Sequence, residues 1–191
     1  KESATRFILT QAGVSFAPST PNGSPFELSQ TRSVSRAPSG ETQLDTTALS
    51  TARRFGRLTT RWELSNLFGK APDPAKPGSR QSLTRQEPLR RIPPFNGRGL
   101  VTYRNNAWFA AAEWQFATAQ KRLAQGDKED NRIPAGGTPG WNLFNLYGGY
   151  KLKQVSFSLG LQNLLHEDYR THGSGINGVC RSGWLSATFV F

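Results

Sequence analysis

Polar and apolar side chains alternate along much of this chain with a period of two, and this pattern is typical of β-strands rather than helices. In the segment 57–68, apolar side chains occupy even positions, among them Leu58, Trp62, Leu64 and Phe68, whereas the odd positions are mainly charged or hydroxylated. The same pattern recurs over 99–104, 107–119, 141–152, 155–162 and 184–191. Because successive side chains of a strand point to opposite faces, each segment predicts a strand with one apolar and one polar face.

The connections between these expected strands alternate between long and short. Long polar connections cover 69–98, 120–140 and 166–181, and short turns fall at Asn105–Asn106 and near Lys153. Long loops at one end and short turns at the other are typical of membrane β-barrels. The sequence therefore predicts an all-β fold, namely an antiparallel up-and-down transmembrane β-barrel segment of roughly eight or nine strands from a larger barrel.

The first part of the chain is less regular. Pattern alone predicts strands over 6–16, 26–36 and 41–52, followed by a turn near Arg53–Arg54. No apolar run approaches the roughly 18 residues of a transmembrane helix, which excludes a helical membrane protein.

The predicted faces assign particular side chains to lipid or to the barrel lumen. The lipid-facing set is Trp108, Trp114, Phe157, Leu159 and Phe189. The lumen-facing set is Glu113, Gln115, Ser156 and Ser158. Each set follows from the parity of its strand, since membrane barrels place apolar side chains outward.

The chain is basic, with a formal net charge of +11. This charge is compatible with nucleic-acid binding, in which tryptophans stack on bases, or with solvated loops. The alternation and the loop lengths instead favour an aromatic girdle at the boundaries of a lipid bilayer and no nucleic-acid partner. The expected girdle residues are Trp62, Trp108, Trp114, Trp141 and Trp184.

No catalytic constellation is present, so we expect no enzymatic activity. The segment 173–178 matches G-x-G-x-x-G, but a strand follows it where a dinucleotide site requires a helix. His166, Glu167, Asp168 and His172 do not have the spacing of a helical zinc site, and a solvated loop explains them more simply. We therefore expect no metal and no cofactor.

Four segments and the last residue carry a family resemblance. They are 91–97 (RIPPFNG), 132–141 (RIPAGGTPGW), 161–170 (LQNLLHEDYR), 172–178 (HGSGING) and Phe191. In this order and spacing, residues 89–191 resemble the C-terminal strands of TonB-dependent outer-membrane receptors. One departure is Cys180–Arg181, where family members often carry Gly-Arg.

The resemblance implies that residues 1–191 are the C-terminal part of a receptor barrel, most clearly over 53–191, and that the plug domain is absent from the chain. The implied location is the cell outer membrane. A whole receptor of this family takes up a scarce solute, such as a metal chelate, a vitamin or a glycan, with energy from TonB. TonB would act through the missing N-terminal plug region.

The resemblance also implies partners and site residues. Outer-membrane lipid surrounds the barrel, and the barrel-assembly machinery reads the terminal strand, so that Phe189 and Phe191 are the expected assembly signal. The candidate loop contacts to a small-molecule solute are Asp168, Arg170 and His172. Two alternatives remain open: another outer-membrane barrel, structural or porin-like, and a soluble basic nucleic-acid-binding β domain.

Overall fold

A single antiparallel sheet runs through the computed structural model, which describes residues 6–14, 27–37, 40–72 and 86–189. The strands are β1 Arg6–Val14, β2 Glu27–Ala37, β3 Gly40–Phe55, β4 Leu58–Pro72, β5 Gln86–Pro88, β6 Asn96–Arg104, β7 Trp108–Ala117, β8 Trp141–Lys151, β9 Val155–Gln162 and β10 Ser182–Phe189. The long strands pair in chain order from β1 to β10, and short β5 pairs with β4 at one side of this path. The predicted fold class, an all-β up-and-down barrel segment, is confirmed. Phe191 lies outside the described residues.

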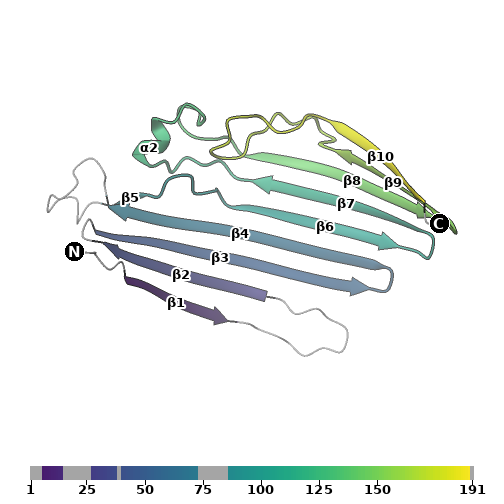
Figure 1. The fold of residues 1–191 in the computed structure, drawn as a ribbon, viewed down its shortest axis with the longest axis horizontal. Helices are drawn as coiled ribbons and strands as arrows, with labels where there is room; N and C mark the ends of the chain where they lie inside the picture. Colours follow the sequence, from purple (N-terminus) through teal and green to yellow (C-terminus); the bar gives the residue numbers. More distant parts are fainter. Residues whose placement is uncertain (1–5, 15–26, 38–39, 73–85, 190–191) are drawn as a thin grey trace.

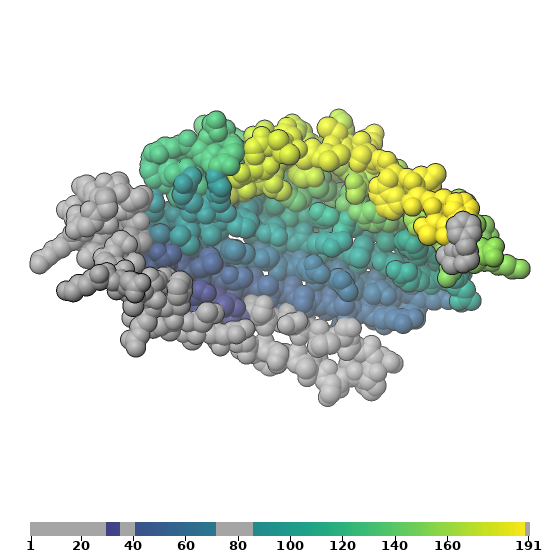
Figure 2. Space-filling view, in the orientation of Figure 1, coloured from purple at the N-terminus to yellow at the C-terminus, as the bar shows by residue number. Residues whose placement is uncertain are grey.

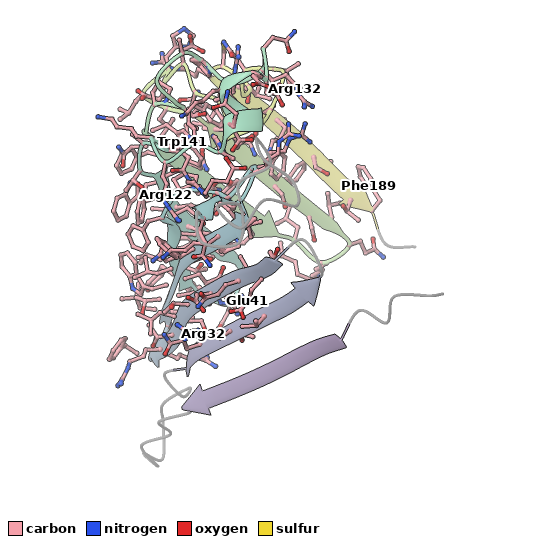
Figure 3. The ribbon with its side chains drawn as sticks, turned by 90° about the vertical axis from the view of Figure 1, so that its left-hand side faces the viewer. Arg32, Glu41, Arg122, Arg132, Trp141 and Phe189 are labelled. Atoms are coloured by element: carbon pink, nitrogen blue, oxygen red, sulfur yellow. The ribbon has the colours of Figure 1, made fainter. Side chains whose placement is uncertain are left out.

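The sheet is curved into an open arc (Figure 3). The connections at the two ends of its strands differ in length. From β3 onward, the short turns lie at one end of the strands, with the end of β10 beside them, and the long connections lie at the other end (Figure 1). The only helix in the described residues is α2, which covers Gln125–Lys128 in one long connection. No helix in the described part of the chain is long and apolar enough to cross a membrane.

Both predicted hairpin turns are confirmed. The Asn105 N–H donates to the Trp108 carbonyl at 2.8 Å, and the Leu152 N–H donates to the Val155 carbonyl at 2.8 Å. The turn expected near Arg53–Arg54 is wrong by a few residues. Phe55 pairs with Leu58, and the chain reverses at Gly56, which has a φ of +58°. Glycine adopts this left-handed conformation without steric cost, whereas the arginines continue the strand.

The connection expected over 69–98 is shorter than predicted. β4 continues to Pro72, β6 begins at Asn96 rather than at Gly99, and β5 pairs with the end of β4. The Leu89 N–H donates to the Gly69 carbonyl at 3.1 Å. Turn-forming prolines and glycines hid these pairings in the sequence, because pattern reading assigns such residues to loops.

Directly opposed residues of an antiparallel pair share a face, so the strand register assigns every side chain to one side of the sheet. Trp62 opposes Gly99, Gly99 opposes Trp114, and Trp114 opposes Phe144, which places one row of rings across four strands. A Cβ at Gly99 would overlap the Trp62 ring. The glycine therefore leaves the space that a neighbouring aromatic side chain fills.

The two predicted faces are on opposite sides of the sheet. Trp108 opposes Tyr150, and Tyr150 opposes Phe157, in a second row on the ring-bearing face, here called the apolar face. Glu113 opposes Asn145 on the other side, here called the polar face. Among the described residues, the buried apolar side chains are only Ala117, Ala124, Ile133 and Leu143.

Large apolar side chains are correspondingly exposed, and Leu185 and Leu159 expose 76% and 45% of their area. Contiguous exposed apolar surface of this kind marks contact with a membrane or another protein. The core of this chain is therefore thin, and the burial that stabilises the apolar face must come from outside the chain.

Candidate functional site at the long-loop end

A hydrogen-bond network on the polar face links three strands to the loop that follows β9. Glu113 is 2% exposed, and its Oε2 accepts from the Asn145 Nδ2 at 2.9 Å and from the Tyr147 hydroxyl at 2.8 Å. Its Oε1 accepts from the Arg98 Nε in an ion pair. A buried carboxylate is costly unless it is paired and hydrogen-bonded, and Glu113 has all of these partners.

Asn163 fastens the loop 163–181 to this network. Its backbone N–H donates to the Asn145 Oδ1 at 2.9 Å. Its Nδ2 donates to the carbonyls of Glu167 and Val179 at 2.8 and 3.0 Å, and its Oδ1 accepts from the Glu167 N–H at 2.8 Å. Asn163 is 3% exposed and has a φ of +52°. Asparagine tolerates this conformation better than most residues, so one side chain holds both ends of the loop.

Two aspartates near α2 hold the segment that precedes β6. Asp127 has no exposed surface, and its carboxylate accepts from the Arg91 N–H at 3.1 Å. Asp130 accepts from the Arg91 guanidinium at 3.2 Å and from the Arg132 guanidinium at 2.6 Å. Figure 2 shows that the connection between β7 and β8, which contains α2, lies beside the connection between β9 and β10. They form a folded cap rather than separate solvated loops.

Arg122 connects this cap to β4 through two side-chain contacts. Its guanidinium lies 3.6 Å from the centre of the Phe68 ring and donates to the Gly69 carbonyl at 3.0 Å. Burial lowers the pKa of Arg122. A cation over an aromatic face is attracted by the ring quadrupole, more strongly as water is excluded.

A pocket of about 250 Å³ opens in the cap. Its lining residues are Pro134, Pro139, Gly140, Trp141, Asp168, Tyr169, Arg170 and Asn177. Asn177 joins the two charged residues, because its Nδ2 donates to the Asp168 Oδ1 at 2.9 Å and its Oδ1 accepts from the Arg170 Nε at 2.8 Å. The rings of Trp141 and Tyr169 are 5.1 Å apart. Apolar walls with a few convergent polar groups are typical of small-molecule sites.

The structure thus brings together two of the three predicted loop contacts. Asp168 and Arg170 line the pocket, whereas His172 is not among its lining residues. The His172 Nδ1 lies 2.9 Å from the Thr138 hydroxyl, and its Nε2 is buried without a hydrogen-bond partner among the described residues. Burial lowers the pKa of His172, and the charge of Asp127 opposes this effect.

The predicted girdle tryptophans divide between the faces. Trp62, Trp108 and Trp114 lie in the rows of the apolar face. Trp184 opposes Gly160, which opposes Tyr147 on the polar face, and a Cβ at Gly160 would lie against the Trp184 indole. Trp141 shares the parity of Asn145 and packs against Tyr169. We therefore keep the first three as the expected girdle.

Sequence reasoning missed Glu113, Asn145 and Asn163 as one network. The sequence held one signal of it: Asn145 is a polar residue in a largely apolar strand, and its neighbours on the same face of that strand are Leu143 and Tyr147. In the part of the chain that the structure describes, no group of three or more His, Cys, Asp or Glu side chains could hold a metal ion.

The family model described as "TonB dependent receptor-like, beta-barrel" matches residues 40–164. Among solved structures, the chain resembles one named "Copper transporter OprC", with a TM-score of 0.62 and 21% sequence identity. The match covers 79% of this chain and 24% of that chain, and an identity this low shows a shared fold alone. No curated protein sequence matches the chain.

Proposed function

Because the chain belongs to the TonB-dependent receptor β-barrel family, we propose that it is part of an outer-membrane active transporter for a scarce solute. The observation that carries the proposal is the family match over 40–164 on a sheet with one apolar face and a folded loop cap at one end. The solute enters from the cap side, and TonB supplies the energy through a plug.

We place the chain in the C-terminal part of its receptor, with the plug in a preceding region. The match to the similar transporter covers 24% of that chain, which supports the view that this chain supplies only part of a receptor. In the proposed orientation, β10 ends beside the short turns, which face the periplasm in barrels of this kind.

The pocket in the cap is the proposed point of contact with the solute. It presents a carboxylate, a guanidinium and an amide in one hydrogen-bonded row beside Trp141 and Tyr169. This set suits a polar organic solute that is held by directional hydrogen bonds and ring contacts, such as a metal chelate, a vitamin or a glycan. Copper, which gives the similar transporter its name, is a further solute to test.

The test uses the full-length receptor in cells with and without TonB. We would measure uptake of a labelled ferric chelate, cobalamin, a maltodextrin and Cu²⁺ by wild type, by Asp168→Asn/Arg170→Gln and by the control Lys121→Gln. We expect one probe to enter only with TonB and the double variant to need more of it for half-maximal uptake. Equal uptake of every probe in the two strains would instead favour a porin-like or structural barrel.

Orientation is tested separately through Cys180, which is exposed in the cap and is the single cysteine of the chain. A membrane-impermeant maleimide should label Cys180 on intact cells, and Cys180→Ser should remove that label. Labelling that requires broken cells would place the cap in the periplasm and contradict the proposal.

A further inference from the structure

Arg54 lies on the polar face of the sheet at the end where the short turns lie. It opposes Thr59, and Thr59 opposes Thr102, in a row on the same side of the sheet as Glu113. The turns between β3 and β4, between β6 and β7 and between β8 and β9 lie together at one end of the ribbon (Figure 1). A membrane barrel turns its polar face toward the lumen, so Arg54 faces the lumen near these turns.

Two further arginines meet in the next row of this face. Arg104 opposes Phe109, which lies on the Glu113 side of β7, and the Arg104 guanidinium is 5.2 Å from the centre of the Phe109 ring. The Arg104 N–H donates to the Arg57 carbonyl at 2.8 Å, which joins the two hairpins. Three arginines from two hairpins are therefore neighbours on the lumen side.

Two adjoining pockets lie along these rows. The first, of about 480 Å³, is lined by Arg54, Arg57, Thr59, Arg104, Asn105 and Asn106. The second, of about 260 Å³, shares the last three of these residues and continues to Phe109, Gly149 and Ser158, which oppose one another in one row of the polar face. A Cβ at Gly149 would overlap the Phe109 ring, so this ring lies over the glycine. The two pockets together are here called the rim groove.

The rim groove carries positive charge without a carboxylate to balance it. The strands β4, β6, β7, β8 and β9 contain only two carboxylates, Glu63 and Glu113. Each lies four positions along its strand from a groove residue, Thr59 or Phe109, which is about 13 Å at the rise of a strand. None of the ion pairs in the described part of the chain involves a residue of the groove other than through its neighbours in sequence. The groove therefore suits an anionic occupant, since guanidinium groups donate paired hydrogen bonds to carboxylate oxygens.

The length of the rim groove favours a stretch of polypeptide over a small anion. Between the turn that follows β3 and Ser158 in β9, the groove crosses four intervals between neighbouring strands, from β4 through β6, β7 and β8 to β9. At about 4.8 Å for each interval, it is roughly 19 Å long. An extended chain of about six residues spans this distance, whereas one carboxylate or phosphate fills only a small part of it. The Phe109 ring in the groove offers an apolar contact to one residue of such a chain.

We infer that the rim groove binds an extended acidic segment of the plug region. Carboxylates of this segment contact Arg54, Arg57 and Arg104, and an apolar side chain between them packs on Phe109. The inference rests on the proposed function, because that function places a plug in the lumen that the polar face lines. The same lumen position separates the groove from the hydrocarbon of the bilayer.

Lys151, which lines the second pocket, is a probe already present in the chain. A water-soluble carbodiimide couples an amine to a carboxylate that touches it, and mass spectrometry of the digested full-length receptor identifies both residues. We expect Lys151 to be linked to Asp or Glu residues within one short stretch of the plug region. Arg57→Lys keeps the charge and adds an amine, and it should give a second link to the same stretch.

The contribution of the arginines is measured by the yield of the Lys151 link. In Arg54→Gln/Arg57→Gln/Arg104→Gln the yield should fall at least about fivefold, because charge-assisted hydrogen bonds to carboxylates are among the stronger ones. The matched control is Lys121→Gln/Lys128→Gln/Arg181→Gln, which removes equal charge from exposed cap positions and should match wild type. Where heat-modifiable gel mobility shows that the groove variant is unfolded, Arg57→Gln replaces it and should give a smaller fall.

Three results would overturn the inference. They are an unchanged yield in the groove variant, an equal fall in the control, and links from Lys151 only to another protein, which would make an external acidic partner the occupant. Uptake by the same receptor separates this inference from the proposed function. Absence of a link to the plug region in a receptor whose uptake needs TonB would refute the inference alone, whereas the same absence with uptake independent of TonB would refute both.

Discussion

The Asn145 Oδ1 accepts a 2.9 Å hydrogen bond from the backbone N–H of Asn163, while the Asn145 Nδ2 donates to Glu113. One amide side chain in β8 thus couples the loop after β9 to a buried carboxylate in β7. The geometry of the cap depends on this contact, because the same loop carries Asp168 and Arg170.

Replacing Asn163 by Ala should release the loop 163–181 and leave the sheet folded. The change removes the donors to the Glu167 and Val179 carbonyls. A buried polar group left without a partner costs about 1–3 kcal/mol. Limited proteolysis should cut the loop faster, with unchanged heat-modifiable mobility. Asn106→Ala, in an exposed turn, is the control, and equal protection of the two variants would contradict this role.

Arginine at Leu159 should destabilise the membrane-inserted barrel far more than arginine at Ser158. Leu159 opposes Leu185 on the apolar face, and Ser158 opposes Ser186 on the polar face. The expected cost at Leu159 is about 2–4 kcal/mol if it lies near the bilayer midplane. Unfolding of the full-length receptor in lipid vesicles would measure both variants. Equal effects would refute the assignment of the faces.

Gly99→Ala should destabilise the barrel, and removal of the Trp62 ring should relieve the effect. The new methyl group would overlap that ring, and overpacking typically costs about 1–3 kcal/mol. Gly148→Ala is the matched control on the same face, because its nearest heavy atom would be an ordinary 3.7 Å away. Chemical unfolding of Gly99→Ala with and without Trp62→Ala gives the coupling. Additive effects would show that the two sites do not interact.

The cap should loosen as the pH falls, through His172. The folded-state pKa of His172 lies below its ordinary value, because burial disfavours the charged ring. The unfolded loop therefore binds a proton more readily, and stability that is present at about pH 7 is lost as the pH falls through the folded-state value. Hydrogen exchange of amides in 163–181 should speed up between about pH 7 and pH 5. His172→Gln should remove this dependence, and a persistent effect would assign it to another group.

In a receptor whose chain ends at Phe191, deleting this residue, or adding polar residues after it, should lower the amount of folded receptor in the outer membrane. Phe189 lies on the apolar face, opposite Val155, and Phe191 has the same parity in the sequence. A pure girdle residue would tolerate an extension, because every side chain stays in place. Heat-modifiable mobility of outer-membrane fractions is the measurement. Normal levels of both variants would show that the last residue carries no assembly signal.

The strands of the sheet could be predicted from the sequence, because a period of two in polar and apolar residues depends only on the geometry of a strand. The alternation over 57–68, 99–104 and 107–119 predicted the strands β4, β6 and β7 and their two faces. The contacts within the cap could not be predicted in this way. Asp127 and Asp130 were expected in a solvated loop, yet Asp127 has no exposed surface. Two of their partners, Arg90 and Arg91, lie more than thirty positions away along the chain, and local patterns carry no information about contacts at that separation.

The pairing of the long strands in chain order has a mechanical consequence. When a single molecule is pulled out of a membrane by its C-terminus, neighbouring strands should detach in succession, beginning with β10 and β9. Each step breaks only the backbone hydrogen bonds to the next strand, so the force trace should show a succession of separate peaks. The largest force should precede the loss of β8, β7 and β6, because Glu113 ties those three strands together across their shared ladders.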